Sequence, residues 1–274
     1  MRTEEIMELA LRMAGLSAVP ADSAIHVPGE EIKRVLVGID LEAPELLWAK
    51  EEGFDLVLTH HPPGGLSALN FWQVLWRQVE LMVGYGVPED LAQAAAAELV
   101  RENRLVNHAR NYLRLPALAR ALGIAYMNIH TPFDEIGRRR LIRAVEEVLE
   151  GATVGELVTC LRSSFGEFRN ALTEIEVVVG NSQNPAGKVA VIHGAGTNGG
   201  YPVAKVLFDH GVDTVIYIHI RPHEAHRLAQ EYGGKGKNLV VTGHIASDSL
   251  GINPFLEALR ERGLEVVPFD LVLP

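Results

Sequence analysis

The stretch Leu56-Val57-Leu58-Thr59-His60-His61-Pro62-Pro63 combines a predicted strand with two adjacent histidines. Its first four residues predict a buried strand, and Pro62 ends that strand because proline cannot donate a hydrogen bond to a sheet. His60 and His61 therefore stand at the carboxyl end of a strand. Open α/β sheets bind their ligands at this edge, so the two imidazoles mark a candidate site.

Strand-like and helix-like segments alternate along the rest of the chain. Predicted strands cover residues 33–39, 56–59, 124–129, 175–179, 189–193, 214–218, 239–242 and 264–269. Predicted helices cover residues 3–14, 44–52, most of 72–122, 136–150, 154–161, 201–210, 222–231 and about 254–262. This alternation predicts an α/β fold.

Two parts of the sequence resemble each other. Gly53–His61 aligns with Gly211–His219, because both contain Gly-x-Asp, an apolar strand and a histidine. All βαβ units share some of these features, since a glycine often ends the helix before a strand. The alternative is an ancient duplication, which we favour. It predicts two similar lobes facing each other across a cleft, 1–135 with a helical insertion at about 66–122, and 136–274.

Composition excludes several classes of protein. The 274 residues carry a net charge of −10 without a long basic cluster, so binding to nucleic-acid phosphates is disfavoured. Cys160 is the only cysteine, which rules out an internal disulfide and a thiolate metal cage. No apolar run approaches the length of a membrane span. Glu4 and Glu5 stand where a signal peptide carries only bases, so we expect a cytoplasmic protein.

Two further segments carry metal-ligand side chains just after predicted strands. Each has a histidine and an aspartate four residues apart, His130 with Asp134 and His244 with Asp248, a spacing that places both side chains on one face of a helix. Neutral imidazoles and carboxylates suit zinc, manganese, iron or cobalt. One such pair is common by chance, but three donor segments at three strand ends favour a site for two divalent metal ions bridged by a carboxylate.

Other polar residues near these strand ends could assist. His130 and His219 are the first and second candidates for moving protons during catalysis. Asp40 ends a strand opposite the double histidine, where it either orients a ligand histidine or caps the following helix.

A glycine-rich segment leaves another function open. Gly194-Ala195-Gly196-Thr197-Asn198-Gly199 fits G-x-G-x-x-G between a predicted strand and a predicted helix, the context of a dinucleotide site. The next strand ends at His219 instead of the acidic residue that binds a ribose. A loop that binds a phosphate or another small anion, and a plain tight turn, are the other interpretations.

The three donor segments together resemble a known family. Thr59–Pro62, His130–Asp134 and Gly243–Asp248 are similar to the motifs of the Nif-three-like dinuclear-metal-centre family, also labelled GTP cyclohydrolase I type 2. The resemblance runs in order through most of the chain. It implies two similar α/β lobes around a metal pair, usually assembled into homo-oligomeric hexamers. The metal ligands that it implies are His60, His61, Asp134, His244 and Asp248.

The chain departs from the family at some positions. Asp248 stands where the family usually has glutamate, and the stretch from His61 to His130 is longer than usual. The expected activity is a metal-dependent hydrolase that acts on a nucleotide or a cyclic amide, although the sequence does not identify the small-molecule substrate. The alternative is a metal-binding or metal-delivery protein without turnover.

Overall fold

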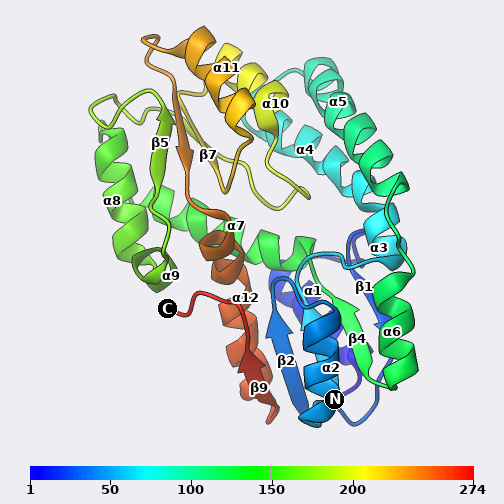
Figure 1. Ribbon diagram of the computed structural model, residues 1–274. Coiled ribbons are helices and arrows are strands. Elements are labelled where there is room, and N and C mark those ends of the chain that lie inside the picture. Colours follow the sequence, from blue (N-terminus) through cyan, green and yellow to red (C-terminus); the bar gives the residue numbers. More distant parts are fainter. Residues whose placement is uncertain (149) are drawn as a thin grey trace. The chain divides into compact units, whose positions relative to one another are not determined.

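The computed structural model describes residues 1–148 and 150–274 (Figure 1). They form two compact units. Unit 1 comprises residues 1–74, 102–136 and 251–271, and unit 2 comprises residues 75–101, 137–250 and 272–274. The lobes predicted from the sequence are consecutive segments, whereas each unit combines three separate ones. Each unit contains one β-sheet with helices, so the α/β class is confirmed.

Unit 1 is built on a five-stranded sheet. Its strand order is β1 (Ala24–Val27), β4 (Ala125–Asn128), β3 (Leu56–Thr59), β2 (Arg34–Gly38) and β9 (Glu265–Pro268). Neighbouring strands are parallel except β1, which runs antiparallel to β4. Because β2, β3 and β4 are parallel, the residues that follow them meet at the same edge of the sheet. The predicted strands did not include β1.

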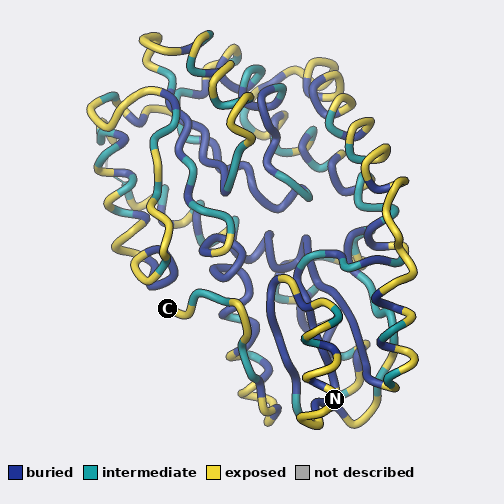
Figure 2. Tube along the Cα trace, in the orientation of Figure 1, coloured by how far each residue is buried: buried dark blue, intermediate teal, exposed yellow. Residues whose placement is uncertain are grey.

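Both faces of this sheet are covered by apolar helix surfaces. Val35 and Val37 of β2 belong to the core shared with α1 (Thr3–Ala14) and the second half of α12 (His244–Arg260). Leu36 points to the opposite core, shared with α2 (Ala43–Glu51) and α6 (Arg114–Leu122). Figure 2 shows the strands as mostly buried. Burial on both faces explains why these strands are continuous apolar runs.

Unit 2 repeats this topology with four strands. Its order is β5 (Glu176–Val179), β8 (Asn238–Val241), β7 (Thr214–Tyr217) and β6 (Val189–Val191). Only β5 is antiparallel to its neighbour. The two sheets thus correspond in strand order and direction. The equivalent strands are β5 and β1, β8 and β4, β7 and β3, and β6 and β2. The predicted similarity of the two lobes is confirmed at the level of the sheets.

The Gly-x-Asp sequences have the same role in the two units. Asp55 Oδ2 accepts hydrogen bonds from the backbone N–H groups of Lys33, at 2.9 Å, and Arg34, at 2.8 Å. Asp213 Oδ2 accepts one from the N–H of Lys188 at 3.0 Å. Each aspartate thereby fixes the start of the neighbouring strand. The sequence similarity therefore corresponds to a repeated structural contact.

Helices occupy the remaining connections. Between β3 and β4 lie α3 (Gly65–Leu69), a 3-10 helix (Phe71–Trp76), α4 (Arg77–Gly84), α5 (Glu89–His108) and α6. The others are α7 (Thr131–Glu146), α8 (Val154–Ser164), α9 (Gly166–Asn170), α10 (Gly200–Asp209) and α11 (Pro222–Tyr232). The helix predicted over 136–150 includes Leu149, which lies outside the described residues. Within 1–148 and 150–274, none of the helices has the length and apolar character needed to cross a membrane.

The start predicted for the last helix is wrong. The prediction placed this helix at about 254–262, but α12 begins at His244 and contains Pro254 in its interior. Proline has no N–H group to donate to the carbonyl four residues earlier. That carbonyl, of Leu250, accepts a hydrogen bond from Arg140 Nη1 at 2.6 Å instead. This contact allows the helix to continue, and no local sequence pattern predicts it.

We expect Arg140→Met to lower the free energy of unfolding by about 2 kcal/mol or more, because it removes the Leu250 contact and the 3.2 Å ion pair with the buried Glu167. Urea unfolding measures this change. Arg143→Met, an exposed position on the same helix, is the control and should have little effect. An equally small effect of Arg140→Met would contradict this account.

Candidate metal centre

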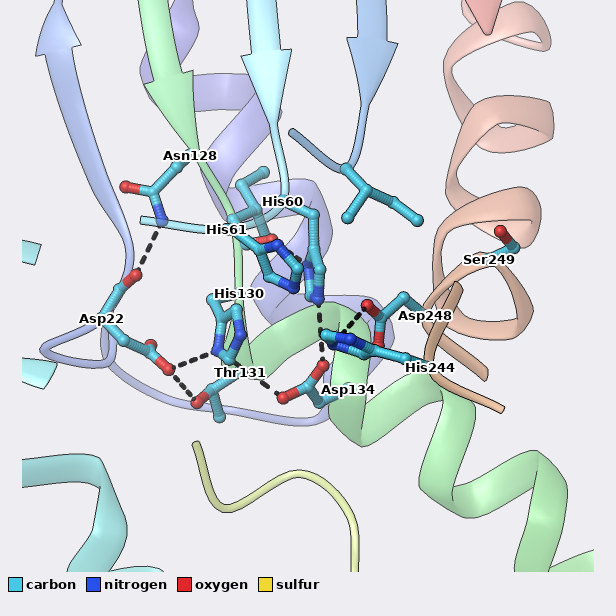
Figure 3. Close-up of polar contacts among 12 residues, drawn as sticks. Asp22, His60, His61, Asn128, His130, Thr131, Asp134, His244, Asp248 and Ser249 are labelled. Carbon is cyan, nitrogen blue, oxygen red and sulfur yellow. Dashed lines mark hydrogen bonds and ion pairs between the residues drawn. The ribbon is translucent and has the colours of Figure 1, made fainter. Parts of the chain in front are cut away.

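Unit 1 brings four of the predicted site residues together. His60 and His61 follow β3, His130 follows β4, and Asp134 lies in the first turn of α7 (Figure 3). One ligand nitrogen from each histidine lies within 4.8 Å of the others. Asp134 Oδ1 is 3.3 Å from His60 Nε2, and Asp134 Oδ2 is 3.6 Å from His130 Nδ1. The parallel strands therefore gather three imidazoles and a carboxylate.

The first two histidines are held through their Nδ1 atoms. His60 Nδ1 is 3.0 Å from the backbone oxygen of Ile129, and His61 Nδ1 is 2.7 Å from Asp40 Oδ1. Both oxygens can only accept, so these contacts assign the proton of each neutral ring to Nδ1. The lone pair is then on Nε2, as a metal ligand requires, and such outer contacts are typical of metal-binding histidines.

Asp40 is itself held by the turn after β2. Of its two possible roles, the structure shows the contact with His61, because the residue that caps α2 is Glu42. Asp270 accepts hydrogen bonds from the N–H of Ile39 at 2.6 Å and from the N–H of Asp40 at 3.0 Å. A side chain at Gly38 would lie 2.5 Å from Asp270 Oδ1, so glycine permits this approach. Burial raises the pKa of Asp270 above its usual value.

Asp22 is a site residue that the sequence did not identify. It is fully buried, and its Oδ2 accepts hydrogen bonds from His130 Nδ1 at 2.9 Å and Thr131 Oγ1 at 2.6 Å (Figure 3). Burial alone would lower the pKa of His130, but Asp134 and Asp22 outweigh it and raise the pKa. The available signal was the Ala24–Val27 segment, whose pairing with β4 places Asp22 beside His130.

Unit 2 contains the other three predicted residues. His244 begins α12 and Asp248 lies one turn later, with 3.2 Å between His244 Nε2 and Asp248 Oδ2. His219 follows β7, and its ring centroid is 4.5 Å from that of His244. Asp248 is buried, whereas His244 is partly exposed.

The two units carry equivalent donors. His219 corresponds to His61 because they follow the equivalent strands β7 and β3. His244 with Asp248 likewise corresponds to His130 with Asp134, after β8 and β4. Unit 1 has an additional imidazole, because the residue equivalent to His60 is Ile218. The repeat therefore extends from the sheets to the candidate ligands.

The glycine-rich segment before α10 is already engaged within the protein. The N–H of Gly200 donates to Asn198 Oδ1, and the N–H of Tyr201 donates to Glu224 Oε1, both at 2.9 Å. A phosphate at this helix start would have to displace the Glu224 carboxylate. This arrangement disfavours the dinucleotide and small-anion interpretations.

The chemistry of the donors fits a metal ion. Imidazole nitrogens and carboxylate oxygens suit zinc, iron, manganese and cobalt, whereas thiolate ligands are absent from both donor groups. The buried histidine and aspartate side chains could therefore hold a metal ion.

Comparison with known proteins agrees with this structure. No family model matches the sequence. A NIF3 superfamily protein from Sphaerobacter thermophilus is 48% identical, with 100% of this chain and 99% of that chain covered and a TM-score of 0.94. A GTP cyclohydrolase 1 type 2 homolog from Archaeoglobus fulgidus is 26% identical over 262 residues, which are 92% of this chain and 89% of that protein.

A more distant structure shares the fold. Reduced HcgD from Methanocaldococcus jannaschii is 17% identical, with 99% of this chain and 98% of that chain covered and a TM-score of 0.60. The family resemblance predicted from the sequence is confirmed by the full-length match to the Sphaerobacter protein at 48% identity. The chain belongs to the NIF3 superfamily.

Proposed function

We propose that this protein is a metal-dependent hydrolase with a dinuclear centre. The proposed ligands are His60, His61, Asp134, His244 and Asp248. The observation that supports it most is the state of His60 and His61, whose Nδ1 atoms are held by protein oxygens so that Nε2 can bind a cation. The resemblance of the donor motifs to the dinuclear-metal-centre family supports the assignment of the two donor groups to one centre.

Asp134 is the proposed bridging ligand. Its Oδ1 lies 3.3 Å from Nε2 of the proposed ligand His60, and its Oδ2 lies 3.6 Å from Nδ1 of the proposed proton carrier His130, so this carboxylate faces both a ligand and the group that would move protons. It is buried, which keeps competing water away from both oxygens. Asp248, one methylene shorter than the usual glutamate, is proposed as a ligand with His244, the imidazole beside it.

The charge balance favours a substrate rich in oxygen. Two carboxylate ligands do not neutralise two divalent cations, so the loaded centre retains a net positive charge. Such a site attracts carbonyl oxygens and phosphates. A nucleotide or a cyclic amide meets this requirement. The Archaeoglobus relative is named a GTP cyclohydrolase 1 type 2 homolog, and this name supports a nucleotide substrate.

The chain supplies positioning and proton transfer. Two ions held by the proposed ligands would supply a water of lowered pKa and would polarise the bond under attack. His130 and His219 are the proposed proton carriers, because each ring lies beside a proposed ligand histidine, His60 and His244 respectively. We also propose a cytoplasmic homo-oligomer, as the family resemblance implies, with the hexamer as its expected form.

Metal content tests the centre itself. Protein purified without added metal should contain two ions per chain by elemental analysis. We expect His60→Ala and His244→Ala each to lower the occupancy of both metal positions, because the proposed bridging carboxylate couples the two positions. His210→Ala, which alters a histidine at the end of α10, is the control. Unchanged metal in both site variants would refute the centre, and loss of one ion in each would indicate two separate sites.

Turnover distinguishes the enzyme from a metal-delivery protein. We expect the loaded protein to hydrolyse at least one member of a panel of nucleotides and cyclic amides, with the activity lost on chelation and restored by metal. Product formation is followed by chromatography. If no panel member reacts while a chelator removes the metal readily, delivery is the better explanation.

A further inference from the structure

We propose that Asp270 is a positioning residue for metal binding, which orients the ligand His61 through Asp40. This inference rests on the proposed function, in which His61 binds an ion. It gives the segment after β9 a part in the metal centre, although that segment contains no proposed ligand. Asp270 was not among the site residues predicted from the sequence.

The carboxylate of Asp270 holds the turn that carries Asp40. Its Oδ1 accepts a hydrogen bond from the N–H of Ile39 at 2.6 Å, and its Oδ2 accepts one from the N–H of Asp40 at 3.0 Å. Asp40 Oδ1 in turn lies 2.7 Å from His61 Nδ1. The Asp40 side chain is 60% exposed, so its position depends mainly on the backbone of the turn. One series of contacts therefore connects Asp270 to the ligand histidine.

The backbone around Asp270 is specialised for this approach. Asp270 has a φ of 50°, in the left-handed region, where aspartate and asparagine are found more often than most other residues with a side chain. A side chain at Gly38 would lie 2.5 Å from Asp270 Oδ1 and 2.7 Å from the backbone oxygen of Phe269. Strained backbone of this kind persists where surrounding contacts hold it. Here those contacts are the two hydrogen bonds to the turn.

An aspartate at the opposite end of β2 makes similar contacts away from the site. Asp55 Oδ2 accepts hydrogen bonds from the N–H groups of Lys33 and Arg34, at 2.9 and 2.8 Å. Asp55 precedes β3, whereas His61 follows it. Each end of β2 is thus held by one carboxylate through two backbone N–H groups, and only the contacts of Asp270 lead to a proposed ligand.

Unit 2 differs from unit 1 in this respect. In the part of the chain that the structure describes, the sheet of unit 2 has four strands and none equivalent to β9. By the register of the two sheets, the residue equivalent to Asp40 is Gly194, which has no side chain. His219 Nδ1 lies 2.6 Å from Asn198 Nδ2 instead. The series of carboxylates therefore belongs to the donor group of unit 1, where the additional strand β9 supplies Asp270.

Titration of the chelator-stripped protein with Zn²⁺ tests this role. Asp270→Gly removes the carboxylate without straining the backbone, because glycine adopts positive φ readily. It should weaken Zn²⁺ binding about tenfold, as the loss of an outer contact to a ligand histidine typically does. Asp270→Asn retains one acceptor oxygen and also tolerates the left-handed region. Its dissociation constant, measured by competition with a chromogenic chelator, should lie between those of the wild type and the glycine variant.

Two comparisons separate positioning from a general loss of stability. Asp55→Ala removes the similar contacts at the other end of β2. It should lower the free energy of unfolding, measured in urea, and leave the dissociation constant for Zn²⁺ unchanged. Asp40→Ala removes the group through which Asp270 acts. When Asp270→Gly is added to Asp40→Ala, we therefore expect no further loss of Zn²⁺ affinity, because the two effects depend on one series of contacts.

The outcomes distinguish this inference from the proposed metal centre. Wild-type affinity for Zn²⁺ in both Asp270 variants would overturn the inference and leave the centre standing. An equal loss of affinity in Asp55→Ala would also overturn it, because the effect would then come from the stability of the sheet. So would a further loss of affinity on adding Asp270→Gly to Asp40→Ala. If the wild-type protein binds no Zn²⁺, the proposed centre fails and this inference fails with it.

Discussion

The site depends on one constraint, which is that a neutral imidazole carries a single proton. An oxygen that accepts a hydrogen bond at Nδ1 therefore leaves the lone pair on Nε2. In unit 1 a backbone carbonyl does this for His60, Asp40 does it for His61 and Asp22 does it for His130. Three oxygens from different segments thus each hold the Nδ1 atom of one histidine ring and leave its lone pair on Nε2. A change in any of these contacts alters what the ring can bind or accept.

The sheet topology makes these contacts possible. Parallel β2, β3 and β4 end at one edge, and the residues that follow them supply the three histidines and two of the oxygens that hold them. The third oxygen belongs to Asp22, which precedes the antiparallel strand β1. Unit 2 repeats the strand order and places His219 and His244 after the equivalent strands. Each unit therefore has one His-x-x-x-Asp segment, placed after an equivalent strand. The added imidazole of His60 and the buried Asp22–His130 contact distinguish the donor group of unit 1.

The sequence predicted what local patterns encode. Apolar runs identified eight of the strands, and the central parallel ones among them are continuous apolar runs because they are buried on both faces. The edge strand β1 is half-buried throughout and lacks this signal. Asp22 escaped detection because its partner is 108 residues away and is reached only through the pairing of β1 with β4. Likewise, the contact that lets α12 pass Pro254 comes from Arg140 on another helix.

The central claim is that donors from both halves of the sequence bind one pair of metal ions. Anomalous diffraction from crystals of the protein as purified, recorded at the absorption edge of the metal present, tests it most directly. The account predicts two peaks about 3.5–4 Å apart, coordinated by His60, His61, Asp134, His244 and Asp248. A single peak, or two peaks each coordinated by only one of the donor groups, would contradict it.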